Sequence, residues 1–86
     1  MIARVLEAKH AGGYRVWLKF HDGLQGDADL SDALRGEVFE PLKDVNEFRK
    51  FKVDPLWQTL VWENGADLAP ESLYERVKRA NLTAAE

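Results

Sequence analysis

The most regular pattern of apolar and polar residues lies in residues 14–30, where two alternating segments flank a turn signal. The first segment has an apolar residue at every second position: Tyr14, Val16, Leu18 and Phe20. This period of two is typical of a strand with one buried face. A three-residue turn at 21–23 pairs Phe20 with Leu24, whereas a two-residue turn would pair Phe20 with Gln25 and mix the two faces. The pattern therefore predicts a hairpin with the longer turn.

The same register decides which residues lie on the opposite face of this hairpin. It pairs Arg15 with Asp29 and Trp17 with Asp27. An outward tryptophan bordered by Arg15 and Lys19 has the composition of a protein interface, where Trp and Arg are enriched. The alternative is that another segment covers Trp17, which would then belong to a second layer of the core.

Residues 2–10 fit a strand or a helix on pattern alone, so the neighbouring hairpin has to decide between them. A loop at 11–13 pairs His10 with Tyr14 and Leu6 with Leu18, and Leu6 then faces the core. A shorter loop at Gly12-Gly13 would set charged residues against Leu18 without a partner, which is unfavourable. The sequence therefore predicts a third strand, with Leu6 buried.

Segments 51–53 and 59–62 are rich in aromatic and β-branched residues and predict a second hairpin. The turn between them contains Trp57. Two short helical turns are expected near residues 31–36 and 44–48. Between these turns, we expect the apolar link around Pro41 to be extended and held under the sheet.

A final helix is predicted from Pro70, because proline favours the first helical position and an apolar stripe follows it. Asn81 is the expected end of this helix, and residues 82–86 are expected to fray. The prediction is therefore one α+β domain over residues 1–81. It has an antiparallel sheet of about five strands, formed by an N-terminal three-stranded meander and a second hairpin, with two or three short helices packed on one face.

Composition adds limits on function. The chain has 86 residues, 45% of them hydrophobic, a formal net charge of −3 and no cysteine. The absence of cysteine excludes disulfides, thiolate metal sites and cysteine nucleophiles. No run of apolar residues approaches the roughly 18 needed to span a bilayer, and no secretory leader is recognisable, so a cytoplasmic location is expected.

The order of short motifs along the chain resembles the small bacterial family catalogued as domain of unknown function 2442. The motifs are Phe20-x-Asp22-Gly23, Asp29-Leu30, Leu34, Gly36-x-x-Phe39-x-Pro41-Leu42-x-Asp44, Phe48, Val53-Asp54, Thr59-Leu60-x-Trp62-x-Asn64-Gly65-Ala66-Asp67-Leu68 and Pro70-x-x-Leu73-Tyr74. The resemblance implies a small α+β fold with an antiparallel sheet and no assigned reaction. It also implies frequent pairing with another small family, as in two-gene toxin–antitoxin modules. Ala69 and Val45 depart from the family pattern.

Candidate catalytic and metal-binding residues are few. Asp27 and Asp29 point the same way on one strand face and offer a weak cation site, although such sites usually recruit more oxygen ligands from a loop. The structural alternative is that Asp29 pairs with Arg15. His10 and His21 lie at opposite ends of a strand and cannot form one site. We therefore expect neither an enzyme nor a bound cofactor.

Basic residues near the end of the chain offer a nucleic-acid alternative. Arg76, Lys78 and Arg79 fall on the last predicted helix and would contact phosphates if they formed a patch. Glu71 and Glu75 are interleaved with them, so a solvated surface of mixed charge is the competing interpretation.

The leading functional hypothesis is a non-enzymatic module that binds another small protein. Its candidate contact residues are Trp17, Arg15, Lys19 and Trp57. We expect no membrane partner, and a monomer or a homodimer formed through a sheet edge. The alternatives are a nucleic-acid-associated regulator and a weak cation-binding domain.

Overall fold

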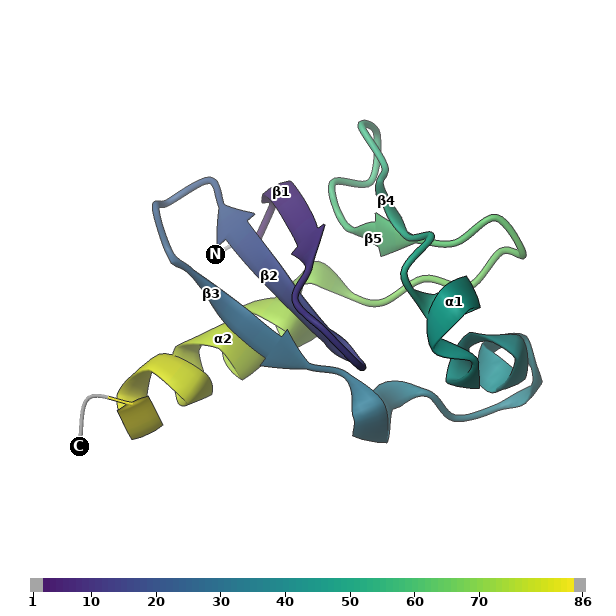
Figure 1. Cartoon of the computed structure of the whole chain (residues 1–86). Helices are drawn as coiled ribbons and strands as arrows, with labels where there is room; N and C mark the ends of the chain where they lie inside the picture. The colour runs from purple at the N-terminus through teal and green to yellow at the C-terminus, as the bar shows by residue number, and fades with distance from the viewer. Residues whose placement is uncertain (1–2, 85–86) are drawn as a thin grey trace.

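A three-stranded antiparallel sheet forms the first third of the chain. Its strands are β1 (Val5–His10), β2 (Arg15–Phe20) and β3 (Gln25–Asp29), in the order β1-β2-β3. In this computed structural model, which describes residues 3–84, the long helix α2 (Pro70–Ala84) lies behind that sheet (Figure 1). The opposite face of the sheet is free of helices in the same view.

The segment between β3 and α2 folds beside the sheet. It contains the 3-10 turns η1 (Ser31–Ala33) and η2 (Glu37–Lys43), the short helix α1 (Val45–Phe48), and a second, two-stranded sheet. The strands of the second sheet are β4 (Lys52–Val53) and β5 (Leu60–Val61). The predicted α+β fold is confirmed, with its five strands divided between two sheets.

The β2–β3 hairpin has the predicted register. Leu18 faces Gly26, Trp17 faces Asp27 and Arg15 faces Asp29. The amide of Phe20 donates to the carbonyl of Leu24 at 2.8 Å, which closes the turn at 21–23. Gly23 has φ +94° there, a conformation that glycine adopts without steric cost. One-sided burial therefore specified this register correctly.

The predicted β1–β2 register is wrong by two residues. His10 faces Val16 instead of Tyr14, and Ala8 faces Leu18. The turn lies one residue later than predicted: the amide of Ala11 donates to the carbonyl of Arg15 at 3.0 Å, and Tyr14 falls in the turn, outside β2. The Tyr14 hydroxyl donates to the carbonyl of Lys43. A bulge between Val5 and Glu7 then changes the face that the start of β1 presents, so that Val5 is buried and Leu6 is exposed.

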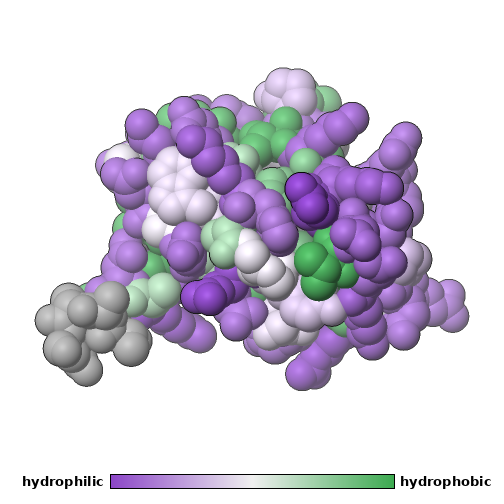
Figure 2. Space-filling model, in the orientation of Figure 1, coloured by the Kyte–Doolittle hydropathy of each residue, from purple (hydrophilic) through white to green (hydrophobic). Residues whose placement is uncertain are grey.

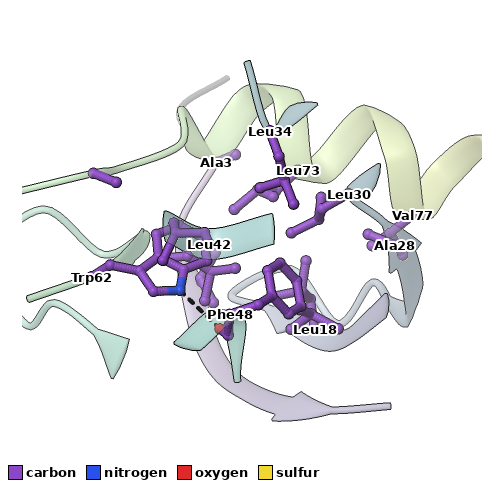
Figure 3. Packing of buried hydrophobic residues seen from close by; sticks show 14 of the residues in the cluster. Ala3, Leu18, Ala28, Leu30, Leu34, Leu42, Phe48, Trp62, Leu73 and Val77 are labelled. Carbon is purple, nitrogen blue, oxygen red and sulfur yellow. Dashed lines mark hydrogen bonds between the residues drawn. The ribbon is translucent and has the colours of Figure 1, made fainter. Parts of the chain in front are cut away.

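The core lies between the inner face of the three-stranded sheet, α2 and the segment around α1. Val16, Leu18 and Phe20 of β2 are fully buried and so are Leu73 and Val77 of α2. At the other end of the core, the rings of Phe48 and Trp62 lie 5.9 Å apart between centroids. The Trp62 indole N–H donates to the carbonyl of Phe48 at 2.8 Å, so this buried polar group is satisfied (Figure 3).

Two expectations for the remaining segments are corrected. The link around Pro41 forms the 3-10 turn η2 and not an extended segment, with Leu42 buried and Val38 exposed. The predicted helix end at Asn81 is also wrong, because α2 continues to Ala84. The predicted tail is therefore helical at 82–84, and residues 85–86 lie outside the described residues.

Packing of α2 against β3 explains why the helix continues past Asn81. The Asn81 side-chain amide donates to the carbonyl of Gln25 at 3.1 Å, and Arg76 donates to the carbonyl of Asp29 at 3.0 Å. Both carbonyls belong to the outer strand of the sheet. Side chains of α2 therefore bind two backbone acceptors on the edge that a homodimer through β3 would have to use.

Candidate functional site

The outer face of the three-stranded sheet carries the first group of predicted contact residues. Arg15, Trp17 and Lys19 lie on β2 opposite residues of β3, as the sequence predicted. Trp17 is partly buried, and the Lys9 ammonium lies 5.4 Å from the centroid of its ring. This cation–π contact occupies one side of the indole. The face of the sheet in this view is mostly hydrophilic (Figure 2).

Among residues 3–82, the loop between β4 and β5 carries the most exposed large apolar side chains. Leu56 is 78% exposed and Trp57 is 71% exposed. This loop projects at the top of the molecule in the view of Figure 1. Of the predicted contact residues, Trp57 is thus much more available to a partner than Trp17.

Hydrogen bonds hold this tip in one conformation. The Asp54 carboxylate accepts from the amides of Leu56 and Trp57, each at 2.8 Å. The amide of Gln58 donates to the carbonyl of Asp54 at 2.7 Å and completes the turn. Gln58 has φ +53°, the one positive value among the non-glycine residues of 3–84. A side chain in this region costs free energy, so the surrounding bonds must maintain it.

The start of β1 lies directly beside the tip. The amide of Val5 donates to the carbonyl of Gln58 at 2.9 Å. That bond brings Leu6, which is 50% exposed at the bulge, to the same end of the molecule. Hydrophobic atoms gather in Figure 2 directly below the tip. We call Leu6, Leu56 and Trp57 the hairpin-tip surface.

Sequence reasoning identified only part of this surface. Trp57 was predicted to lie in a turn, but Leu56 was not singled out, although two neighbouring apolar residues in a turn were a readable signal. The predicted loop at 11–13 places Leu6 in the core, and nothing in the local pattern indicates the bulge in β1 that exposes it.

The predicted basic patch on α2 is partly engaged with the rest of the chain. Arg76 forms an ion pair with Asp32 at 2.6 Å, and its side chain is 25% exposed. The Arg76 guanidinium lowers the pKa of Asp32 through this hydrogen bond and its charge. Lys78 and Arg79 are exposed on the same helix. Arg76 is therefore a clamp between α2 and the sheet.

The predicted cation site gains no further ligand from the fold. Asp27 and Asp29 lie on β3, and one Asp29 carboxylate oxygen accepts from the amide of Ser31 at 3.0 Å. This bond lowers the pKa of Asp29. Within residues 3–84, no group of three or more His, Cys, Asp or Glu side chains is arranged to hold a metal ion.

A second carboxylate joins α2 to the β2–β3 turn. Asp22 accepts from the Tyr74 hydroxyl at 2.6 Å and from the amide of Leu24 at 3.0 Å. The Tyr74 bond is the main cause of a lowered pKa for Asp22, and the carboxylate raises the pKa of Tyr74 in turn. Asp22 and Asp32 thus both hold α2 in place.

The comparisons with known proteins identify the family. A family described as "Protein of unknown function (DUF2442)" matches residues 5–79. The chain belongs to this family. The resemblance inferred from the ordered motifs is thereby confirmed, and the match reaches from β1 into α2.

Neither the curated proteins nor the solved structures contain a match to this chain. Membership of the DUF2442 family assigns no reaction. Among residues 3–84, the structure has no helix with the length and apolar character needed to cross a membrane. The geometry of the described surface is therefore the basis for any functional proposal.

Proposed function

We propose that this DUF2442 protein is a non-enzymatic interaction module that binds a second small protein through the hairpin-tip surface. The observation that supports the proposal most strongly is the exposure of Leu56 and Trp57 on a loop that is already ordered. Large apolar side chains so exposed leave a favourable burial free energy unused in the isolated domain.

Order in the loop makes the surface more suitable for binding. Partner contacts lose less free energy when the contacting residues are already held in one conformation. The Asp54 bonds and the Val5–Gln58 bond supply this order. Because the loop projects from the molecule, the matching surface on the partner is an apolar groove that takes both side chains.

The partner that we propose is the product of a neighbouring gene, in a two-gene module of toxin–antitoxin type that acts in the cytoplasm. Tryptophan is among the residues most enriched at the energetic centres of protein interfaces. Arg15, Trp17 and Lys19 then remain available as a secondary contact region on the outer face of the sheet. The nucleic-acid and cation-binding alternatives have less support, because Arg76 and Asp29 are engaged within the chain.

The direct test is co-expression of this chain with the product of the adjacent gene, followed by co-purification and a measurement of Kd. We expect Trp57→Ala to weaken the complex by at least 2 kcal/mol, or about 30-fold, the magnitude of an interface hot spot. Leu82→Ser is a matched control, because Leu82 is also exposed, at 62%, but lies on α2.

Two outcomes would count against the proposal. One is the absence of any complex between the two proteins. The other is a complex whose Kd responds equally to Trp57→Ala and to Leu82→Ser, since a specific anchor at the tip requires a difference between them. Preserved circular dichroism of each variant shows that any loss of binding is not a loss of folding.

A further inference from the structure

A pocket of about 300 Å³ opens on the side of the molecule formed by η2, α1 and the end of β5. Its apolar lining consists of Pro41, Leu42 and Trp62, and its polar lining of Glu47, Lys50, Glu63 and Asn64. Leu42 and Trp62 are buried, whereas the polar residues are exposed. The pocket therefore has an apolar floor and a charged rim. Its volume is at the lower end of the range typical of small-molecule sites.

Most polar groups at the rim already have partners within the chain. Glu47 and Lys50 pair with each other at 3.0 Å. The Asn64 side chain donates to the carbonyl of Val38 at 2.8 Å and accepts from the amide of Ala66 at 3.1 Å. Within residues 3–84, no hydrogen bond or ion pair engages the carboxylate of Glu63. One uncompensated negative charge thus borders an apolar floor.

We propose that this pocket binds a small organic amine that carries one positive charge on an apolar body. The apolar body would contact Pro41 and the parts of Leu42 and Trp62 that line the pocket, and the ammonium group would pair with Glu63. A carboxylate beside an apolar surface favours a cation over a neutral or anionic molecule of the same shape. The site is separate from the hairpin-tip surface and does not depend on the proposed protein partner.

Phenethylammonium is a suitable probe, because it combines an aromatic ring with a primary ammonium group and is small enough for a pocket of this volume. A ligand of this size has a Kd on the order of millimolar. The isosteric alcohol 2-phenylethanol replaces the ammonium group by a neutral hydroxyl. It reports what the apolar contacts contribute without the charge.

The experiment is an NMR titration of the ¹⁵N-labelled protein with each compound. We expect phenethylammonium to shift the indole N–H signal of Trp62 and the amide signals of Lys50 and Glu63, and to leave the indole signal of Trp57 unchanged. We also expect it to bind about three- to fivefold more tightly than 2-phenylethanol, since a partly exposed charge pair contributes up to about 1 kcal/mol.

Glu63→Gln removes the charge and keeps the shape of the side chain. We expect this variant to bind phenethylammonium about three- to fivefold more weakly and 2-phenylethanol with unchanged affinity. Glu71→Gln is the matched control, because Glu71 is exposed on α2 and outside the pocket. The proposal is overturned by equal affinity for the two compounds, by unchanged affinity in Glu63→Gln, or by shifts that map to Trp57 and not to Trp62.

Discussion

The three-stranded sheet and the β4–β5 hairpin place apolar side chains in opposite environments. Val16 and Leu18 of β2 are fully buried, whereas Leu56 and Trp57 project from the β4–β5 loop. The contrast extends to two tryptophans of the same segment. Trp57 is 71% exposed, whereas Trp62 is 5% exposed and its indole N–H is hydrogen-bonded. Residue type alone therefore does not determine whether these side chains are buried or exposed.

Backbone order at the tip explains how the domain maintains this contrast. The loop is stabilised by polar bonds from Asp54, so its conformation does not require burial of Leu56 or Trp57. In the core, order and burial occur together, as in the Phe48–Trp62 contact. Substitutions in the two regions should therefore separate stability from binding.

The largest expected effect on stability is that of Trp62→Ala. Removing a buried aromatic ring costs about 3–5 kcal/mol, because transfer free energy is lost and a cavity remains. The variant also leaves the carbonyl of Phe48 without its indole donor. A domain of this size has a total stability on the order of 5–10 kcal/mol, so Trp62→Ala is expected to be partly unfolded at 37 °C. Urea denaturation followed by far-UV circular dichroism measures this loss.

Trp57→Ala is the control for that measurement. The Trp57 side chain is exposed, and Trp57→Ala keeps the backbone amide that bonds to Asp54, so this substitution should change stability by about 0.5 kcal/mol or less. A loss above about 2 kcal/mol for Trp57→Ala would contradict the contrast, because it would mean that the tip is part of the folding core.

A smaller effect is expected at Gly26, where α2 crosses β3. A Cβ atom at this position would lie 2.8 Å from the Asn81 side-chain oxygen and 3.3 Å from a Val77 methyl group. Gly26→Ala is therefore expected to cost about 1–3 kcal/mol, through overpacking and through its φ of +154°. Thermal unfolding measures the loss.

Removal of Asn81 distinguishes the two sources of this cost. If the close approach dominates, Gly26→Ala should cost less in an Asn81→Ala background than in the wild type. An equal cost in both backgrounds would assign the effect to the backbone conformation instead. Tip residues play no part in this contact, so partner binding by folded Gly26→Ala should be unchanged.

The sheet was predictable where one face is buried and the turn is short. The β2–β3 register follows from the need to keep Phe20 and Leu18 on one face. The structure of β1 was not predictable for two reasons: Tyr14 lies in the β1–β2 turn with its hydroxyl bonded to the distant carbonyl of Lys43, and a bulge between Val5 and Glu7 exposes Leu6. Local periodicity carries no information on either feature.

The candidate surface was predictable only in outline. The exposure of Trp57 follows from its position in a turn, but its greater exposure than that of Trp17 depends on tertiary structure. Lys9 covers one side of Trp17 only because the revised register places it opposite that residue. The length of α2 also depends on tertiary contacts, because the Asn81 side chain bonds to β3 and the helix continues past it.

Asp54→Ala should lower both stability and partner affinity. It removes the side-chain acceptor from the amides of Leu56 and Trp57, at a cost of about 0.5–2 kcal/mol in stability. The loop then loses order, so partner binding should weaken further even though no contact residue has changed. Isothermal titration calorimetry with the partner measures the second effect.

Asp44→Ala is the matched control for this prediction. Asp44 accepts from the amide of Asn46 at the start of α1 in the same way, at 2.9 Å. Its loss should reduce stability by a similar amount and leave partner affinity unchanged. Equal loss of affinity in both variants would indicate that order at the tip does not matter for binding.

The smallest expected effect is the pH dependence of the hydrogen bond between Asp22 and Tyr74. The folded state lowers the pKa of Asp22, mainly through the Tyr74 hydroxyl, so the carboxylate stabilises the fold at pH values above its unfolded pKa. That contribution is lost as the pH falls through the lower, folded pKa. The pKa of Tyr74 is raised instead, so the neutral hydroxyl stabilises the fold at neutral pH. This contribution is lost only as the pH rises through the raised, alkaline pKa.

Asp22→Asn should therefore lower Tm at neutral pH, and the difference in Tm from the wild type should shrink well below about pH 4, where aspartate is ordinarily protonated. Tyr74→Phe provides the test of cause, because Asp22→Asn should have a smaller effect once the hydroxyl is gone. A difference that stays constant from neutral to strongly acidic pH would show that the charge of Asp22 does not hold α2. Partner affinity at the hairpin tip should be unchanged in Asp22→Asn and in Tyr74→Phe, because Asp22 and Tyr74 join α2 to the β2–β3 turn and not to the β4–β5 loop.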